Sequence, residues 1–183
     1  MVMDFYNERR KQLAEVEPNE AHKALVRLEE KFKVTTVTQN VDDLHDRAGS
    51  SKIIHLHGEL TKVRSQKYVD MPSWLDKAID VGYKEVKMGD LCPETGQQLR
   101  PHIVWFGEYP FQVNKAYDAV SEADILLVVG TSLQIGYTLD MLNNVKRVPS
   151  QCEIYYIDPQ PTRYLDNYGL KVNYISKKAV EGG

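Results

Sequence analysis

Two histidines in one short apolar segment are the first candidates for acid–base chemistry. His55 and His57 are separated by a single residue, so in a strand their side chains point to opposite faces. An imidazole suits a general base because its unperturbed pKa lies near neutrality. A structural histidine in the core is the plainer interpretation of either one alone. Gly58 follows His57 directly and would leave room for a substrate to approach, but the residues alone take the choice no further.

Polar residues also follow three apolar segments that favour strands. In a parallel sheet, ligands bind at the carboxyl ends of the strands, and amides, hydroxyls, carboxylates and a flexible glycine suit a sugar and a phosphate. Each group taken singly is more typical of a turn or a helix cap. The three groups are Gln39, Asn40 and Asp42; Gly130, Thr131 and Ser132; and Asp158, Pro159 and Gln160.

Strands alternating with helices are predicted to position these groups. The continuous apolar run at 125–129 is typical of a strand buried on both faces. Asn19 is a good N-terminal cap for the helix expected at 20–32. This alternation indicates an α/β fold with a doubly wound parallel sheet. The expected strands are 34–38, 53–56, 125–129, 153–157 and 172–175, and the expected helices are 1–15, 20–32, 113–120 and 139–145.

The segment 61–98 differs from its surroundings. Lys and Asp are frequent there, and Trp74, Leu75, Ala78 and Ile79 suggest one short helix. We therefore expect a small subdomain at 61–98, inserted into a domain formed by 1–60 and 99–183.

Composition narrows the setting of the protein. The 183 residues carry a net charge of −3, which implies no basic face for nucleic acid. No apolar stretch approaches the ~20 residues of a membrane span. Cys92 and Cys152 are too few for a disulfide framework, so a cytoplasmic location is expected, with no nucleic-acid or membrane partner.

Several segments together resemble the sirtuin (Sir2) family. They are 38–45 (TQNVDDLH), 47–49 (RAG), 55–58 (HLHG), 99–108 (LRPHIVWFGE) and 130–132 (GTS), in the family's order. The resemblance implies a Rossmann-like sheet, NAD as cofactor, and removal of acyl groups from protein lysines. The products would be free lysine, nicotinamide and O-acyl-ADP-ribose.

The resemblance also assigns roles to residues. His57 matches the catalytic base, and residues 104–108 would pair with an extended substrate peptide by strand addition. The cofactor-binding residues would be Gln39, Asn40, Val41, Asp42, Gly130, Thr131, Ser132, Asp158, Pro159, Gln160 and Ala179. The peptide-binding residues would be Val104, Trp105, Phe106, Gly107 and Glu108.

The segment Phe5–Arg10 resembles the class III branch, which removes succinyl and malonyl groups. Tyr6 and Arg9 are three residues apart and share a helix face. The planar, permanently charged guanidinium fits a carboxylate bidentately, and Tyr adds a hydroxyl donor. On spacing alone such a pair is typical of an ordinary surface helix. In this family it predicts recognition of an acyl chain that ends in a carboxylate.

The chain departs from the family in two places. The family's zinc site takes four cysteines, whereas 61–98 holds only Cys92, so no zinc is expected and packing around Trp74 and Leu75 would hold the subdomain. The family's glycine-rich phosphate loop and first strand also have no counterpart, so weak NAD binding is expected. Two further hypotheses stay open: a peptide- or ADP-ribose-binding module without catalysis, and ADP-ribosyl transfer.

Overall fold

The computed structural model describes residues 2–68, 77–133, 136–145 and 152–182. The chain forms two compact units, one from Met1–Pro18 and Leu28–Gln112, the other from Asn19–Arg27 and Val113–Gly183. None of the described helices is long and apolar enough to cross a membrane.

A two-stranded parallel sheet positions the first set of candidate residues. β1 (Thr36–Thr38) pairs with β2 (Ile53–His55), and Thr38 lies opposite His55 in the register. α3 (Leu44–Ala48) lies between them in sequence and ends at Gly49. Gly49 adopts a φ of 100°, a left-handed conformation that glycine reaches without steric cost. The carboxyl ends of β1 and β2 therefore lie side by side.

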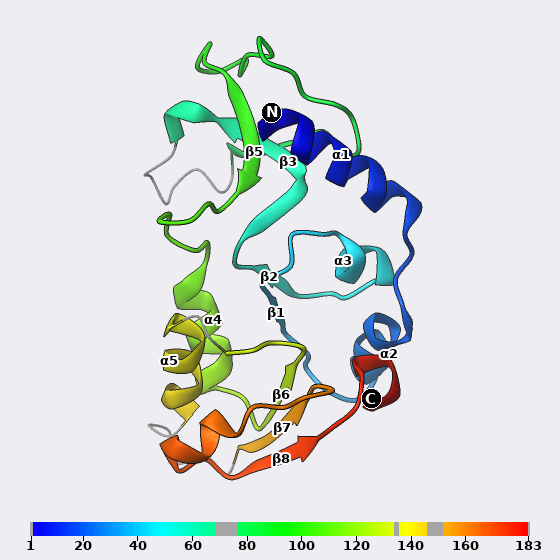
Figure 1. Ribbon diagram of the computed structural model, residues 1–183, viewed down its shortest axis with the longest axis vertical. Coiled ribbons are helices and arrows are strands. Elements are labelled where there is room, and N and C mark those ends of the chain that lie inside the picture. The colour runs from blue at the N-terminus through cyan, green and yellow to red at the C-terminus, as the bar shows by residue number, and fades with distance from the viewer. Residues whose placement is uncertain (1, 69–76, 134–135, 146–151, 183) are drawn as a thin grey trace. The chain divides into compact units, whose positions relative to one another are not determined.

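An antiparallel sheet forms the rest of the first unit. Its order is β4 (Ile79–Asp80), β3 (Gly58–Ser65) and β5 (Leu99–Ile103). α1 (Val2–Glu15) lies beside β3 and β5 (Figure 1). The buried Arg10 fixes this contact, because its Nε donates to the Leu60 carbonyl at 2.7 Å. A short 3₁₀ helix, η1 (Gln66–Tyr68), follows β3.

The second unit contains a parallel three-stranded sheet. Its order is β6 (Ile125–Val129), β7 (Glu153–Ile157) and β8 (Val172–Ile175). α4 (Val113–Ser121) and α5 (Gly136–Val145) pack against each other (Figure 1). α2 (Glu20–Leu28), the 3₁₀ helix η3 (Arg163–Tyr168) and α6 (Ala179–Gly182) complete the unit.

The expected elements are present; β6, β7 and β8 have the expected bounds, while the others are shorter or longer by a few residues. Asn19 caps α2 as predicted, since its Oδ1 accepts the backbone N–H groups of Ala21 and His22. The expected burial of 125–129 on both faces is wrong. Ile125, Leu127 and Val129 alternate along the strand and so share one face, and they are 47%, 38% and 40% exposed.

The small subdomain differs in detail from the expected one. The helix suggested by Trp74, Leu75, Ala78 and Ile79 falls largely outside the described residues, and Ile79 itself belongs to β4. The expected packing around Trp74 and Leu75 lies outside them too. β3 (58–65) begins before residue 61, the expected start of the subdomain, and its partner β5 (99–103) begins after residue 98, the expected end. The sheet β4-β3-β5 therefore extends beyond both expected boundaries.

Candidate active site

His57 lies where the two parallel strands end. The Leu56 backbone N–H donates to the Thr38 carbonyl at 2.9 Å, which continues the β1–β2 ladder to the residue before His57. The His57 imidazole is half-buried and hydrogen-bonds the backbone of Gln39. The candidate base is therefore held against the first of the predicted nicotinamide-binding residues.

The surroundings of His57 favour its neutral form. Burial lowers the pKa of His57, while the hydrogen bond to the Gln39 backbone acts in the opposite direction. A neutral imidazole is the form that can accept a proton, so the environment suits a general base.

Gly58 has a different role from the expected one. It has a φ of +86°, and a Cβ at this position would lie 1.9 Å from the His102 carbonyl oxygen. The space beside Gly58 is thus filled by the backbone of β5, not left open for a substrate. The glycine allows β3 to turn away from His57 directly into its pairing with β5.

The segment after β1 is tied to the same strand ends. The Val41 carbonyl accepts the Leu60 N–H at 2.7 Å, and the Asn40 N–H donates to Thr38 Oγ1 at 3.1 Å. Asp42 Oδ1 accepts the Leu44 N–H at 3.1 Å at the start of α3. Asn40 is exposed. The structure therefore brings the predicted 39–42 segment and His57 together.

The segment 104–108 is held as a turn by a buried ionic cluster. Arg100 donates to both Glu108 carboxylate oxygens, at 2.6 and 3.1 Å, and Arg64 lies 3.3 Å from the same carboxylate. The Trp105 N–H donates to Glu108 Oε2 at 2.9 Å. Burial raises the pKa of Glu108, but Arg100 and the Trp105 N–H outweigh it and lower the pKa overall. Glu108 is thus ionised and fixes the turn.

Two backbone N–H groups of this turn already donate hydrogen bonds within the protein. The Val104 N–H donates to the His57 carbonyl, and the Glu108 N–H donates to the Trp105 carbonyl, each at 2.9 Å. A substrate peptide adding as a strand would therefore pair with the remaining backbone groups of the segment. Phe106 is fully exposed, and Gly107 adopts a φ of 88°.

Tyr6 also meets this segment. Trp105 Nε1 donates to the Tyr6 hydroxyl at 2.9 Å, and Val2, Phe5, Tyr6 and Trp105 line a pocket of about 380 Å³. Arg9 lies on the exposed side of α1, with its guanidinium 5.2 Å from the Phe5 ring centroid and 3.2 Å from Gln12 Oε1. The structure therefore joins Tyr6 to Trp105, while Arg9 lies next to this pocket without lining it.

The remaining predicted residues lie at the carboxyl edge of the sheet in the second unit. The Gly130 N–H donates to the Ile157 carbonyl at 3.1 Å, and the Tyr156 hydroxyl donates to the Thr131 carbonyl at 2.6 Å. Asp158 Oδ1 accepts the Gln160 N–H at 2.8 Å. Ser132 and Pro159 follow the ends of β6 and β7 and are exposed, and Ala179 begins α6.

The charged cluster around Glu108 was not anticipated from the sequence. Arg64 and Arg100 are 36 residues apart, but they are direct partners in the register of β3 with β5. Only that pairing places both guanidiniums on one carboxylate. The alternation of charged and apolar residues within each segment carries no signal for it.

The residues around Cys92 do not fit the structural zinc site of the resembled family. Cys92 is 4% exposed and packs in an apolar cluster with Met3, Val63, Val86 and Leu99. Its neighbours Ser65 and Thr95 instead join their hydroxyls at 2.6 Å. Among the described residues Cys92 belongs to no group of three or more potential metal ligands, and one thiol cannot hold a tetrahedral zinc.

The parallel sheets and the strands that alternate with helices define an α/β protein of the Rossmann type. Residues 1–136 match the model of the Sir2 family. The chain belongs to the Sir2 family, as the sequence motifs predicted.

Two bacterial relatives support this assignment, and both are named NAD-dependent protein deacylase. The protein from Bacteroides thetaiotaomicron is 45% identical over 183 residues, which are 100% of this chain and 75% of the relative. The protein from Helicobacter pylori strain ATCC 700392 / 26695 is 46% identical over 159 residues, 87% of this chain and 65% of the relative.

Solved structures show the same fold. A Sir2 homolog–NAD complex matches with a TM-score of 0.79 and 32% identity, covering 98% of this chain and 67% of that one. A Sir2–p53 peptide–NAD⁺ complex matches with a TM-score of 0.70 and 28% identity, covering 93% and 69%. The predicted Rossmann-type fold, the family and NAD as its cofactor are thereby confirmed, as is an NAD-dependent enzyme of the sirtuin type.

Proposed function

We propose that this protein is an NAD-dependent protein-lysine deacylase that favours succinyl and malonyl groups. The observation that carries the proposal is the His57 imidazole, half-buried, hydrogen-bonded to the Gln39 backbone and held at the joined ends of β1 and β2. The names of the relatives support deacylation of proteins with NAD. The preference for acidic acyl groups is supported by Tyr6 and Arg9.

The chain's own residues would act in three ways. Asn40 and Asp42 would hold the nicotinamide end of NAD, and residues 130–132 and 158–160 with Ala179 would hold the rest of the cofactor. Bound NAD supplies an electrophilic ribose carbon with nicotinamide as its leaving group. His57 would accept the proton of a ribose hydroxyl, a role that its lowered pKa supports.

The substrate side of the site would be formed by α1 and the 104–108 turn. Trp105 and Phe106 would pack around the stem of the acyl-lysine, and the backbone of the turn would pair with the peptide. Tyr6, already bonded to Trp105 through its hydroxyl oxygen, keeps its own proton to donate. Arg9 would pair with the terminal carboxylate of a succinyl or malonyl group.

We further propose that the 61–98 segment folds without zinc. The support is the donor set around Cys92, in which two hydroxyls occupy positions near a single buried thiol. The hydroxyl pair and the apolar cluster would do the work of the metal in tying β3 to the segment before β5.

The release of nicotinamide tests the proposed function directly. The 183-residue chain is incubated with NAD and either a succinyl-lysine peptide, the same peptide with unmodified lysine, or no peptide. We expect steady release only with the succinyl-lysine peptide, and we expect His57→Ala to abolish that turnover. The E85Q variant, which changes an exposed carboxylate outside the site, should match the parent chain.

The other hypotheses predict different patterns. Release that continues without an acyl-lysine, with transfer of label from NAD to protein, would establish ADP-ribosyl transfer instead. Binding of the succinyl-lysine peptide without any release, in the parent chain and in His57→Ala alike, would establish a non-catalytic module.

A further inference from the structure

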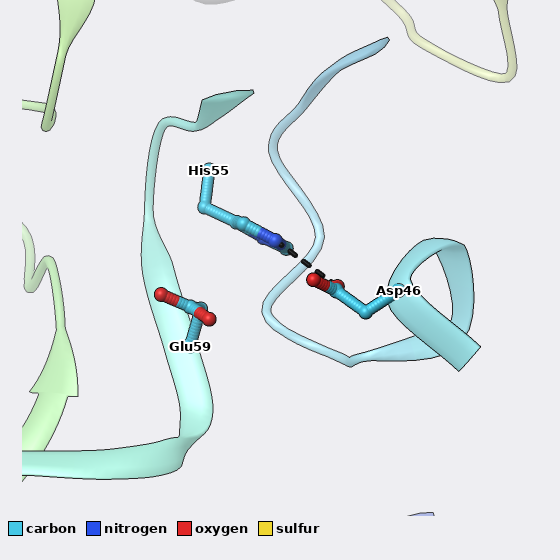
Figure 2. A group of neighbouring side chains, drawn as sticks. All are labelled: Asp46, His55 and Glu59. Carbon is cyan, nitrogen blue, oxygen red and sulfur yellow. Dashed lines mark ion pairs between the residues drawn. The ribbon is translucent and has the colours of Figure 1, made fainter. Parts of the chain in front are cut away.

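A cluster of one imidazole and two carboxylates lies at β2, the strand that leads to His57. Asp46 on α3, His55 on β2 and Glu59 on β3 each offer one donor atom, and these atoms all lie within 4.8 Å of one another. Figure 2 shows the His55 ring and the Asp46 carboxylate pointing toward each other, with Glu59 beside the ring. Among the described residues this is the one such group.

His55 is the residue that distinguishes this cluster from an ordinary acidic surface. It is 7% exposed, so more than nine tenths of it is buried. Nδ1 has no hydrogen-bond partner within the described structure. Nε2 pairs with Asp46 Oδ2 at 3.2 Å. The buried imidazole thus places one nitrogen donor next to two carboxylate oxygen donors, a combination found in metal sites.

The cluster is accessible from solvent. Asp46 and Glu59 line a pocket of about 290 Å³, whose wall also holds Asp43 and Asp80. The cations that face this region are Lys62, 2.8 Å from Glu59, and Arg47, 3.4 Å from Asp43. Four carboxylates therefore outnumber two cations, which gives the pocket a net attraction for a further positive ion.

We propose that Asp46, His55 and Glu59 bind a divalent transition-metal ion, such as Zn²⁺, at a site separate from the family's cysteine zinc site. One imidazole nitrogen with two carboxylate oxygens is a donor set that such ions accept, with solvent filling the remaining position. Oxygen-only cations such as Mg²⁺ are disfavoured by the nitrogen. The ion would tie α3 to β2 and β3, and so brace the 39–42 segment against β2, the strand that leads to His57.

Lys62 sets the condition for binding. Its amine holds both Glu59 oxygens, at 2.8 and 2.9 Å. Donors around a tetrahedral zinc lie about 3.4 Å apart, so Asp46 and His55 are already close enough and Glu59 must turn toward them. Lys62 must then swing away, which its partly exposed side chain permits. The metal and the Lys62 amine therefore compete for Glu59.

Calorimetric titration of the untagged, metal-stripped chain with ZnCl₂ tests the proposal. We expect one ion per chain, with affinity at least about tenfold weaker in H55A and in E59Q. D46N, at an exposed position that folding tolerates, should weaken binding as well. K62M should strengthen binding by up to about fivefold, because it removes a partly exposed competing ion pair. E85Q is the matched control for E59Q and should bind as the parent does.

Replacing Zn²⁺ by Co²⁺ identifies the donors. The visible spectrum of the cobalt-loaded chain should show nitrogen and oxygen ligation without thiolate-to-metal charge transfer. Three outcomes would overturn the proposal: no saturable binding up to millimolar ZnCl₂, equal binding by the parent and D46N, or a thiolate signal that places the ion at Cys92 or Cys152.

Discussion

In the proposed function, individual side chains on α1 would determine the selectivity for the acyl group. Arg9 is exposed, and within the described part of the chain its guanidinium contacts Gln12 and the Phe5 ring. It is therefore available to a carboxylate on an incoming acyl chain. Tyr6 is anchored by Trp105, so its hydroxyl is held in position.

Arg9→Met is expected to lower kcat/KM for a succinyl-lysine peptide by about 10- to 100-fold. The reason is the loss of a charged hydrogen bond, which contributes ~1.5–3 kcal/mol. Steady-state kinetics with succinyl- and acetyl-lysine peptides measure this, and the acetyl value should stay within about twofold. Lys11→Met, which removes another exposed cation of α1, serves as control. Equal losses on both peptides would contradict the assigned role of Arg9.

Two hydroxyl groups, those of Ser65 and Thr95, are paired in the small subdomain. Ser65 Oγ lies 2.6 Å from Thr95 Oγ1, and Ser65 is 1% exposed. Ser65→Ala should lower the free energy of unfolding by ~1 kcal/mol, because it leaves Thr95 without this bond. Urea unfolding of the metal-stripped chain measures the change. A parent chain in which this segment is unfolded once stripped of metal would refute the zinc-free interpretation.

At the scale of elements, the pairing of β3 with β5 determines the conformation of the 104–108 turn. It places Arg64 and Arg100, 1% and 3% exposed, on the carboxylate of Glu108. Arg100 also stacks on the Trp105 ring, with 3.5 Å between the guanidinium carbon and the ring centroid. The conformation of the 104–108 segment thus depends on the register of two strands outside it.

Glu108→Gln should lower the free energy of unfolding by about 3 kcal/mol near pH 7, because a carboxylate facing two buried cations is removed. The pKa of Glu108 is lowered in the folded state, so its contribution is present above the unfolded pKa of about 4.3. That contribution is lost as the pH falls through the folded value.

Denaturant unfolding of both chains between pH 7 and pH 3 checks this expectation. The difference between the parent and the variant should be largest near neutrality and shrink below pH 4.5. A difference that is independent of pH would show that the carboxylate charge does not carry the effect.

Much of this arrangement could be predicted from the sequence because the signals are local. The cap at Asn19 and the strand ends at 39–42 and 130–132 follow from residues adjacent along the chain. The Arg64–Arg100–Glu108 cluster and the grouping of Asp46 with Glu59 could not be predicted, because they depend on tertiary pairing. The exposure of one face of β6 likewise depends on which elements cover that face, which the run of apolar residues does not encode.

At the scale of the whole molecule, the predicted cofactor-binding residues fall in both units of the chain. His57 and the 39–42 segment belong to the first, and 130–132 and 158–160 belong to the second. Both sets lie at carboxyl ends of parallel strands, the place where dinucleotides bind in Rossmann-type folds.

The proposed function depends most on His57 and Asn40 facing the same end of the cofactor. Titration of the isotope-labelled chain with NAD, followed by NMR, tests this even when binding is weak. The His57 ring and the Asn40 side-chain amide resonances should shift together along one binding curve, while those of His22, on α2, stay unchanged. Saturable binding of NAD that leaves both groups unperturbed, or perturbs only one of them, would contradict the account.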